Sequence, residues 1–480
     1  TKAYSRQKRE FFIFIIKEII MSSQPPKQKD PQPRDNFTSR MGVLAATLGS
    51  AVGLGNIWKF PSLTGTSGGA AFILVYMIFV LLLGLPVLVS EHVLGRAARI
   101  NPVDAFKRLS SSKFPWGIVG VIGVSGAFLI LAFYTEVAGW VLAYIPRAIT
   151  GSILTTDPAT AGETFTALIT NPVGSLFWQW VDLLIVGAII LFGISKGIEA
   201  ATKRLIPLLL VLLIIVAVRS LTLPGAEAGL EFLLKPDFSK LTPAVILTAM
   251  GLAFFKLSVG MGVMMTYGSY YPDEQNILSN GFKVALSDVA IALLAGVAIF
   301  PAVFALGFEP NSGPALLFIT IPAVFASMPL GRVFIIIFFV LAFIASIGAQ
   351  VSLVEAVVTF LQERLNWDRR KTTIISIISL AIFGALAALS NSTLADVKVF
   401  GKTFFDFFDH VSSNIMLPAG GLLISIFIGW IWGKEKFVNA MTNNGKLNNQ
   451  GTVTVLFNVL RWLTPVLITI VFLSSLKIIG

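Results

Sequence analysis

The chain has 480 residues, of which 55% are hydrophobic and 13% are charged, whereas soluble domains carry roughly 25% charged residues. Its mean hydropathy of +0.83 indicates an integral membrane protein. The sequence has no cysteine and two histidines, His92 and His410, which excludes disulfide frameworks, thiol nucleophiles and imidazole clusters. The net charge of +11 lies mainly in short segments between apolar stretches, so we do not expect nucleic acid as a partner.

Apolar windows of about 20 residues predict about eleven membrane-spanning helices. They lie near residues 41–64, 70–95, 117–147, 177–194, 200–222, 242–268, 281–307, 330–361, 372–390, 402–432 and 453–477. Most Lys and Arg residues fall in alternate connecting segments. By the positive-inside rule this predicts a multi-pass protein of the inner (plasma) membrane, with a cytoplasmic N-terminus and the C-terminus outside.

The spans predict two five-helix halves and one further helix. We expect a cytoplasmic N-terminal segment at 1–40, in which 1–20 would precede a natural start at Met21. The remaining parts are a first repeat at 41–222, an extracellular loop at 223–241, a second repeat at 242–432, a cytoplasmic loop at 433–452 and the eleventh helix at 453–480. The fold class is therefore all-α, with a 5+5 inverted repeat.

Glycine-rich runs interrupt the first and sixth spans at mid-membrane. The first run is 50–56 and the second is 258–262. A broken helix frees backbone groups that lipid cannot satisfy, so it persists only around a cavity filled by water or ligand. Paired breaks in the two halves are typical of transporters that bind their substrate at the midplane. The alternative is that the glycines only allow close helix packing.

Five motifs carry a resemblance to a known family. They are GSAVGLGNIWKFP at 49–61, GGAAF at 68–72, GISKGIE at 193–199, PDFSKL at 236–241 and PAVF at 301–304. With these motifs the chain resembles the neurotransmitter:sodium symporter family from about Arg34 to its end. It is most similar to the shorter bacterial amino-acid transporters with the leucine-transporter fold. The resemblance implies a secondary transporter and not an enzyme.

The resemblance also implies a substrate site for a zwitterion. Amides around Leu54 and Gly55, with the Tyr134 hydroxyl, would bind the carboxylate, since half-helix N-termini attract anions. Carbonyls near Ala51 and Phe255 would accept from the amine. Phe255 would cover the ligand, and four residues would line its side-chain pocket: Val52, Ile130, Ser258 and Met261.

Charged residues at corresponding positions imply two gates. Lys59 and Asp409 match an outer gate pair, and Arg34 with Phe37 matches an inner latch whose acidic partner would be Glu363. Exposed ion pairs contribute only about 0–1 kcal/mol. Such pairs suit gates that must open during each transport cycle.

The first sodium site departs from the family pattern. Backbone near Ala51, the side chain of Asn56 and the acid Asp288 stand at ligand positions, but the hydroxyl position of the sixth span aligns with Lys256. An ammonium has only donors and a positive charge, whereas a hard cation needs oxygen ligands. We therefore expect Lys256 to displace this sodium ion and to contact the substrate.

Three interpretations of Lys256 remain open. Its ammonium could be a tethered substitute for the cation, paired with Asp288 and the substrate carboxylate. It could instead titrate and couple transport to protons. In the third interpretation the helix is rotated and Lys256 lines a vestibule. An unpaired lysine at mid-membrane costs several kcal/mol, so a partner is expected.

The second sodium site departs from the pattern as well. Backbone oxygens around Gly49, Val52 and Ala345 could remain, but the two hydroxyl ligands of the eighth span align with Gly348 and Ala349. Changes at both sites predict that sodium coupling is reduced, altered or absent. No cofactor is expected.

We do not expect chloride dependence, because Asp288 supplies a fixed negative charge where chloride-using members bind the halide. The favoured function is transport of an amino acid or a related small amine by alternating access. Three alternatives remain: an ordinary sodium symporter, an uncoupled facilitator or a ligand-sensing receptor on the same fold. The partners predicted are a small-molecule substrate and membrane lipid, and the sequence leaves the oligomeric state open.

Overall fold

The computed structural model describes residues 35–308, 316–476 and 478. Within these residues the regular structure is helical, apart from one isolated bridge between Val399 and Lys402. Met21, Arg34 and the predicted N-terminal extension lie outside the described residues.

The helices follow one another with short connections, and short π or 3₁₀ segments (η) continue several of them. The first half contains α2 (Arg40–Ala51), η1 (Gly55–Lys59), α3 (Phe60–Thr66), α4 (Ala70–Phe79), η2 (Val80–Gly84), α5 (Leu85–Ala98), α6 (Pro102–Leu109), α7 (Gly117–Thr150), α8 (Pro158–Ile169), α9 (Pro172–Leu191), η3 (Ile194–Glu199) and α10 (Ala200–Leu221). The second half contains α11 (Ala226–Leu234), η4 (Phe238–Lys240), α12 (Pro243–Lys256), α13 (Val263–Gly268), α14 (Ile277–Ala305), η5 (Leu316–Thr320), α15 (Ile321–Ala326), α16 (Gly331–Leu365), α17 (Arg369–Ala388), η6 (Leu389–Asn391), α18 (Phe404–Asp409), η7 (His410–Met416), α19 (Leu417–Ile426) and η8 (Phe427–Trp432). The chain continues with α20 (Lys434–Met441), α21 (Gln450–Asn458), η9 (Val459–Leu463) and α22 (Thr464–Ser475).

Several helices begin at a polar cap followed by proline. Asn101, Asp157, Asn171 and Thr242 each accept a hydrogen bond from a first-turn amide, and each precedes a proline. Proline fits this first position because its missing N–H would have no partner there. These dipeptides therefore fix where α6, α8, α9 and α12 start.

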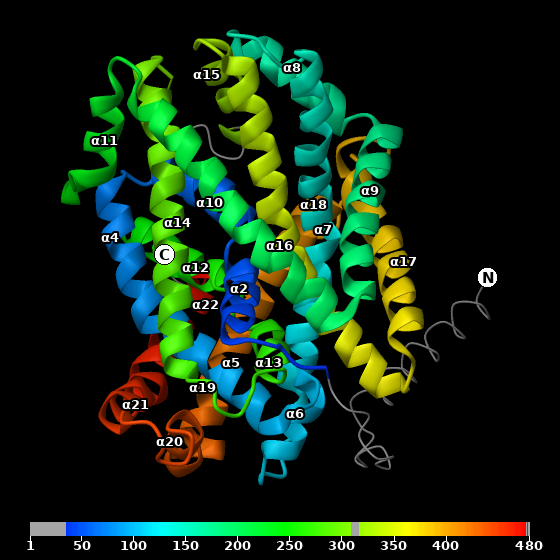
Figure 1. The fold of residues 1–480 in the computed structure, drawn as a ribbon, viewed down its shortest axis with the longest axis vertical. Coiled ribbons are helices and arrows are strands. Elements are labelled where there is room, and N and C mark those ends of the chain that lie inside the picture. Colours follow the sequence, from blue (N-terminus) through cyan, green and yellow to red (C-terminus); the bar gives the residue numbers. More distant parts are fainter. Residues whose placement is uncertain (1–34, 309–315, 477, 479–480) are drawn as a thin grey trace.

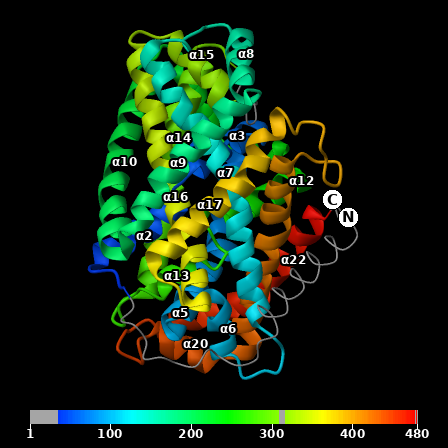
Figure 2. The same ribbon diagram turned by 90° about the vertical axis from the view of Figure 1, so that its right-hand side faces the viewer.

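Among the described residues, nine helices are long and apolar enough to cross a membrane, and the pair Arg40–Ala51 and Gly55–Thr66, bent by 49°, adds a broken span. Helix α12 is a shorter apolar helix, and α13 follows it after a break at 257–262. Both helices lie within the predicted sixth span, 242–268. The helices form an upright bundle with α8 and α15 at one end and α20 at the other (Figures 1 and 2). The predicted loops 223–241 and 433–452 each contain a short helix, α11 and α20.

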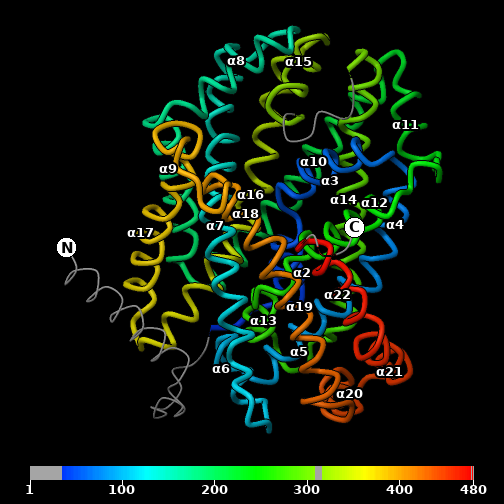
Figure 3. Tube along the Cα trace, turned by 180° about the vertical axis from the view of Figure 1, so that it is seen from behind, coloured from blue at the N-terminus to red at the C-terminus, as the bar shows by residue number. Residues whose placement is uncertain are grey.

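The broken helices lie inside the bundle. Helix α2 packs against α10 and α16, α13 packs against α5, and α16 packs along α7. Figure 3 shows the bundle from behind, with α22 beside α19. Outward-facing apolar side chains on α9 and α10, among them Leu184 and Val211, are exposed. A surface of this kind suits contact with lipid, which needs no polar groups.

Candidate functional site

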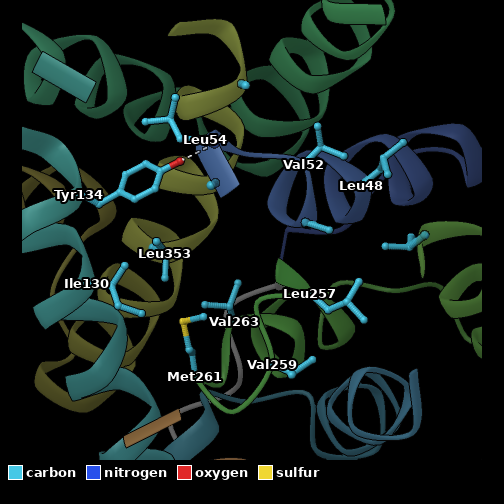
Figure 4. Close-up of a cluster of buried hydrophobic side chains, with 14 of the residues drawn as sticks. Leu48, Val52, Leu54, Ile130, Tyr134, Leu257, Val259, Met261, Val263 and Leu353 are labelled. Carbon is cyan, nitrogen blue, oxygen red and sulfur yellow. Dashed lines mark hydrogen bonds between the residues drawn. The ribbon is translucent and has the colours of Figure 1, made fainter. Parts of the chain in front are cut away.

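The first break leaves backbone amides with specific partners. Helix α2 ends at Ala51, and the Leu54 amide donates to the Tyr134 hydroxyl oxygen at 2.9 Å. Figure 4 shows this bond, with Ile130 one turn away from Tyr134 on α7. The Gly53 amide donates to Asn56 Oδ1 at 3.3 Å. The break therefore places amides in the bundle interior, where they can receive an anionic group.

The second break lies between α12 and α13. Gly260 and Gly262 have φ values of +84° and +70°, a region that glycine adopts at little cost. Ser258 has a φ of 52°, and its hydroxyl donates to the Ser50 carbonyl at 2.9 Å. This hydroxyl was predicted to line the substrate's side-chain pocket, and in the structure it joins the two broken helices.

Glu91 on α5 supports the second break. Its carboxylate accepts from the amides of Gly260, at 2.5 Å, and Met265, at 3.3 Å. Glu91 is fully buried. We did not single out Glu91 from the sequence, although an acid inside the predicted span 70–95 is itself a signal of a functional or structural site.

Lys256 and Asp288 form a buried ion pair. Nζ of Lys256 lies 3.1 Å from Oδ2 of Asp288, and both side chains have 0% exposure. Tyr76 donates to the same Oδ2 at 3.1 Å, and Asn56 Nδ2 donates to Oδ1 at 2.8 Å. The ammonium also lies over the rings of Phe60 and Tyr76, 5.1 and 5.3 Å from their centroids. Asp288 is the partner that the sequence predicts for Lys256, whereas the contact with Tyr76 was not predicted.

The polar oxygens at the first sodium position have partners within the protein. Asn56 Oδ1 accepts from Gly53, and both Asp288 oxygens accept hydrogen bonds. A positive charge already stands beside the carboxylate. The cluster can therefore be electrically balanced without a bound metal ion.

The remaining predicted substrate residues lie close to the two breaks. Ala51, Val52, Leu54, Ile130 and Met261 are buried, whereas Gly55 and Phe255 are partly exposed. The Met261 backbone packs on α7, since a Cβ built on Gly123 would lie 2.8 Å from its carbonyl carbon. The Phe255 carbonyl, expected to receive the substrate amine, accepts from the Ser258 amide at 3.3 Å.

The second sodium position is a close contact between α2 and α16. A Cβ built on Gly348 would lie 2.4 Å from the Gly49 carbonyl oxygen. A Cβ built on Gly53 would lie 3.0 Å from Ala349 Cβ and 3.9 Å from the Ala345 carbonyl oxygen. The predicted backbone oxygens of Gly49 and Ala345 thus face the contact. A side chain at position 348 has no room in this conformation.

The outer gate residues have separate partners. Lys59 Nζ lies 3.7 Å from the centre of the Phe255 ring, and Asp409 Oδ1 accepts from the Ser413 hydroxyl at 2.7 Å. Lys59 and Asp409 do not form an ion pair in the described conformation.

At the other end, Phe37 is buried and packs edge-on against Tyr267 and Tyr270, with centroids 5.7 and 6.1 Å apart. Glu363 accepts from the Asn101 backbone amide at 2.6 Å and from its side-chain amide at 3.0 Å. Arg34, the third member of the predicted inner gate, lies outside the described residues. Phe37 therefore packs against the residues that follow the second break, at the end of the bundle opposite to Lys59 and Asp409.

Two broken helices meeting inside a bundle of membrane-crossing helices define a transporter of the inverted-repeat class. Comparison with known proteins identifies the family. The family model described as "Sodium:neurotransmitter symporter family" matches residues 34–159 and 165–479. The chain belongs to this family, and it is a transporter and not an enzyme.

Relatives and a solved structure agree with this assignment. An uncharacterized sodium-dependent transporter of Bacillus subtilis, YhdH, is 41% identical over 460 residues, which cover 96% of this chain and 100% of the relative. An uncharacterized sodium-dependent transporter of Haemophilus influenzae is 36% identical over 454 residues, covering 92% and 98%. The crystal structure of MhsT in complex with L-phenylalanine has a TM-score of 0.85 and 41% identity, and covers 92% of this chain and 100% of MhsT. The chain thus has the predicted leucine-transporter fold.

Proposed function

We propose that this protein imports an amino acid or a related small amine by alternating access, and that Lys256 takes the place of the first sodium ion. The protein would lie in the plasma membrane with its N-terminus in the cytoplasm. The observation that carries the proposal is the ion pair of Lys256 with Asp288. Its atoms Nζ and Oδ2 lie 3.1 Å apart, and both side chains are fully buried. Sodium coupling would accordingly be reduced or absent.

The charge pattern around the breaks supports an amino acid as substrate. The Leu54 amide donates to the Tyr134 hydroxyl oxygen at 2.9 Å, and both groups could donate hydrogen bonds to the carboxylate of a bound substrate. The Lys256 ammonium adds a positive charge on the facing helix. MhsT, which shares 41% identity, has been crystallised with L-phenylalanine. A hydrophobic or medium-sized amino acid is therefore our first candidate.

A fixed carboxylate supports independence from chloride. Asp288 accepts a hydrogen bond from Tyr76 and pairs with Lys256. A negative charge in this cluster performs the balancing role that a halide has in other members of the family. We therefore propose transport without chloride and without a cofactor.

The sodium symporter alternative has support of its own, because the relatives in Bacillus subtilis and Haemophilus influenzae are both described as sodium-dependent. Thermal unfolding of the purified protein with a panel of amino acids and amines, in sodium and in choline buffer, separates the two, since a ligand that binds only the folded state raises its stability. Equal stabilisation in both buffers is the expected result. Stabilisation in sodium alone would overturn the role of Lys256.

Accumulation separates a transporter from a facilitator or receptor. In sodium-free proteoliposomes that carry an imposed pH gradient or membrane potential, we expect the stabilising amino acid to accumulate above its external concentration. Flux that stops at equal concentrations would indicate a facilitator. Binding without flux would indicate a receptor.

A further inference from the structure

A further buried acid lies inside the bundle, outside the cluster of Lys256 and Asp288. Asp182 on α9 has 0% exposure. Its Oδ1 accepts from Gln350 Nε2 at 3.0 Å, and its Oδ2 has no hydrogen-bond partner. Within the described part of the chain, Asp182 forms no ion pair. Gln350 Oε1 also has no hydrogen-bond partner.

The neighbours of Asp182 provide no compensating cation. Helices α7, α16 and α17 pack on α9, as do α8, η3 and η6. The titratable and charged groups on these elements, away from the ends of α7, α16 and α17, are Tyr134, Glu136 and Tyr144 on α7, Glu355 on α16, Glu163 on α8, and Lys196 and Glu199 on η3. Those in the end turns of the three long helices are Arg147, Arg332, Glu363, Arg364, Arg369, Arg370 and Lys371.

Three of the acids on the neighbouring helices have partners of their own. Glu355 pairs with Arg369 at 2.6 Å, Glu199 pairs with Lys203 at 2.5 Å, and Glu136 accepts from the Trp140 indole at 2.5 Å.

A lone carboxylate with one amide donor is costly in this environment, because ionised groups inside a membrane need a partner or solvent. Protonation removes the charge and makes the acid a donor. Gln350 can serve both states: its NH₂ donates to the carboxylate, and after rotation of the amide its oxygen accepts from the carboxylic acid. The pair can therefore keep one hydrogen bond between the two side chains in either protonation state.

The pair is connected to the substrate site through two short routes. Gln350 follows Ala349, whose Cβ lies 3.0 Å from the position of a Cβ on Gly53 in the first break. Helix α9, which carries Asp182, is joined to α7 beside Tyr134, because Gln179 donates to the hydroxyl of Thr135 at 3.1 Å. Tyr134 itself accepts from the Leu54 amide at 2.9 Å. A negative charge at Asp182 would thus oppose a carboxylate bound at Tyr134.

We propose that Asp182 takes up one proton from water when the substrate carboxylate binds, with Gln350 as its partner in both protonation states. Hydronium gives up the proton by cleavage of one of its O–H bonds and leaves as water, while a new O–H bond forms at the Asp182 carboxylate. This removes the negative charge that would oppose the carboxylate end of the zwitterionic ligand. This inference rests on the proposed function, because the carboxylate is that of an amino-acid substrate. It makes Asp182 the coupling residue of a proton and amino-acid symporter.

The test is amino-acid affinity as a function of pH in sodium-free buffer, with L-phenylalanine as first probe and the other amino acids of the panel after it. For the unaltered chain, affinity falls about tenfold per pH unit above the titration midpoint, the slope for one linked proton. The variant Asp182→Asn is isosteric with the protonated acid and holds affinity constant over the same range. Gln350→Leu, which removes the donor to the carboxylate, moves the midpoint to higher pH.

Glu136→Gln is the matched control, since Glu136 is a buried acid on α7 with an unpartnered oxygen. It keeps the pH profile of the unaltered chain. If Asp182→Asn keeps the same pH slope, the inference is overturned and the proposed amino-acid function stands. If folded, unaltered protein binds none of the amino acids at any pH, the proposed function fails and the inference with it.

Infrared spectroscopy gives a readout that needs no substrate. The spectrum of the unaltered chain minus that of Asp182→Asn cancels the bands of the other carboxyl groups. We expect this difference to show one protonated carboxyl C=O band at low pH that is lost as the pH rises. A difference spectrum without this band would overturn the assignment to Asp182 whatever the protein transports.

Discussion

Nζ of Lys256 and Oδ2 of Asp288 lie 3.1 Å apart with both side chains fully buried. The lysine ends α12, the helix before the second break, whereas the aspartate lies on the unbroken helix α14. Asn56, beyond the first break, donates to the same aspartate. One carboxylate thus holds both broken helices, so its charge balance matters for stability as well as for transport.

Removal of one partner from this pair should destabilise the protein strongly. Lys256→Met leaves a buried carboxylate, and Asp288→Asn leaves a buried ammonium. Each change should cost about 3–5 kcal/mol, the usual loss for an uncompensated buried charge. Unfolding of the protein in lipid nanodiscs measures this. The double variant should recover most of the loss, and a double variant as unstable as the sum of the single variants would contradict the pairing.

Restoration of an oxygen ligand should create a sodium site. Lys256→Thr removes the ammonium, supplies a hydroxyl and leaves Asp288 with an unbalanced charge beside Asn56. We expect sodium, and not choline, to stabilise this variant, by about 2.7 kcal/mol at 100 times the dissociation constant.

Lys256→Met is the control for the sodium site, since it also frees Asp288 but adds no oxygen. Equal responses of Lys256→Thr and Lys256→Met to sodium would show that charge alone, without the hydroxyl, accounts for the effect. A folded threonine variant that ignores sodium would contradict the substitution of a cation by Lys256.

The fold could be predicted from sequence because its signals are local. Apolar windows indicate spans, and the glycine runs at 50–56 and 258–262 indicate breaks whatever the packing. The motifs at 49–61 and 193–199 then identify the family. The signals for where helices begin are also local, since N-cap residues such as Asn171 and Thr242 directly precede proline.

Residues of the site could be predicted only where a family motif fixes their positions in the sequence. Asp182 and Gln350 are 168 positions apart, and nothing in either segment indicates that the two side chains meet. Tyr76 beside Asp288 depends in the same way on the rotation of α4 against α14. For Gly348 the sequence reveals a lost hydroxyl, whereas its close approach to the Gly49 carbonyl depends on the distance between two helices.

A larger residue at position 348 should separate α2 from α16. In Gly348→Thr the new Cβ would lie 2.4 Å from the Gly49 carbonyl oxygen, and overpacking of this kind typically costs 1–3 kcal/mol. We therefore expect a lower melting temperature and, on addition of sodium, little recovery. Ala349→Ser adds one oxygen next to it and is the control, with a smaller expected loss. A Gly348→Thr variant as stable as Ala349→Ser would mean that the two helices separate readily.

The outer gate should form only when substrate is bound. In the described conformation Lys59 lies over Phe255 and Asp409 accepts from Ser413, so closure has to exchange both contacts for the ion pair. Because the chain has no cysteine, Lys59→Cys with Asp409→Cys provides a unique pair for a short bifunctional thiol reagent. We expect the stabilising amino acid to accelerate cross-linking, as judged by mass spectrometry of the linked peptides. The two single variants control for modification without linkage. A cross-linking rate that does not change with the amino acid would contradict a substrate-driven gate at these positions.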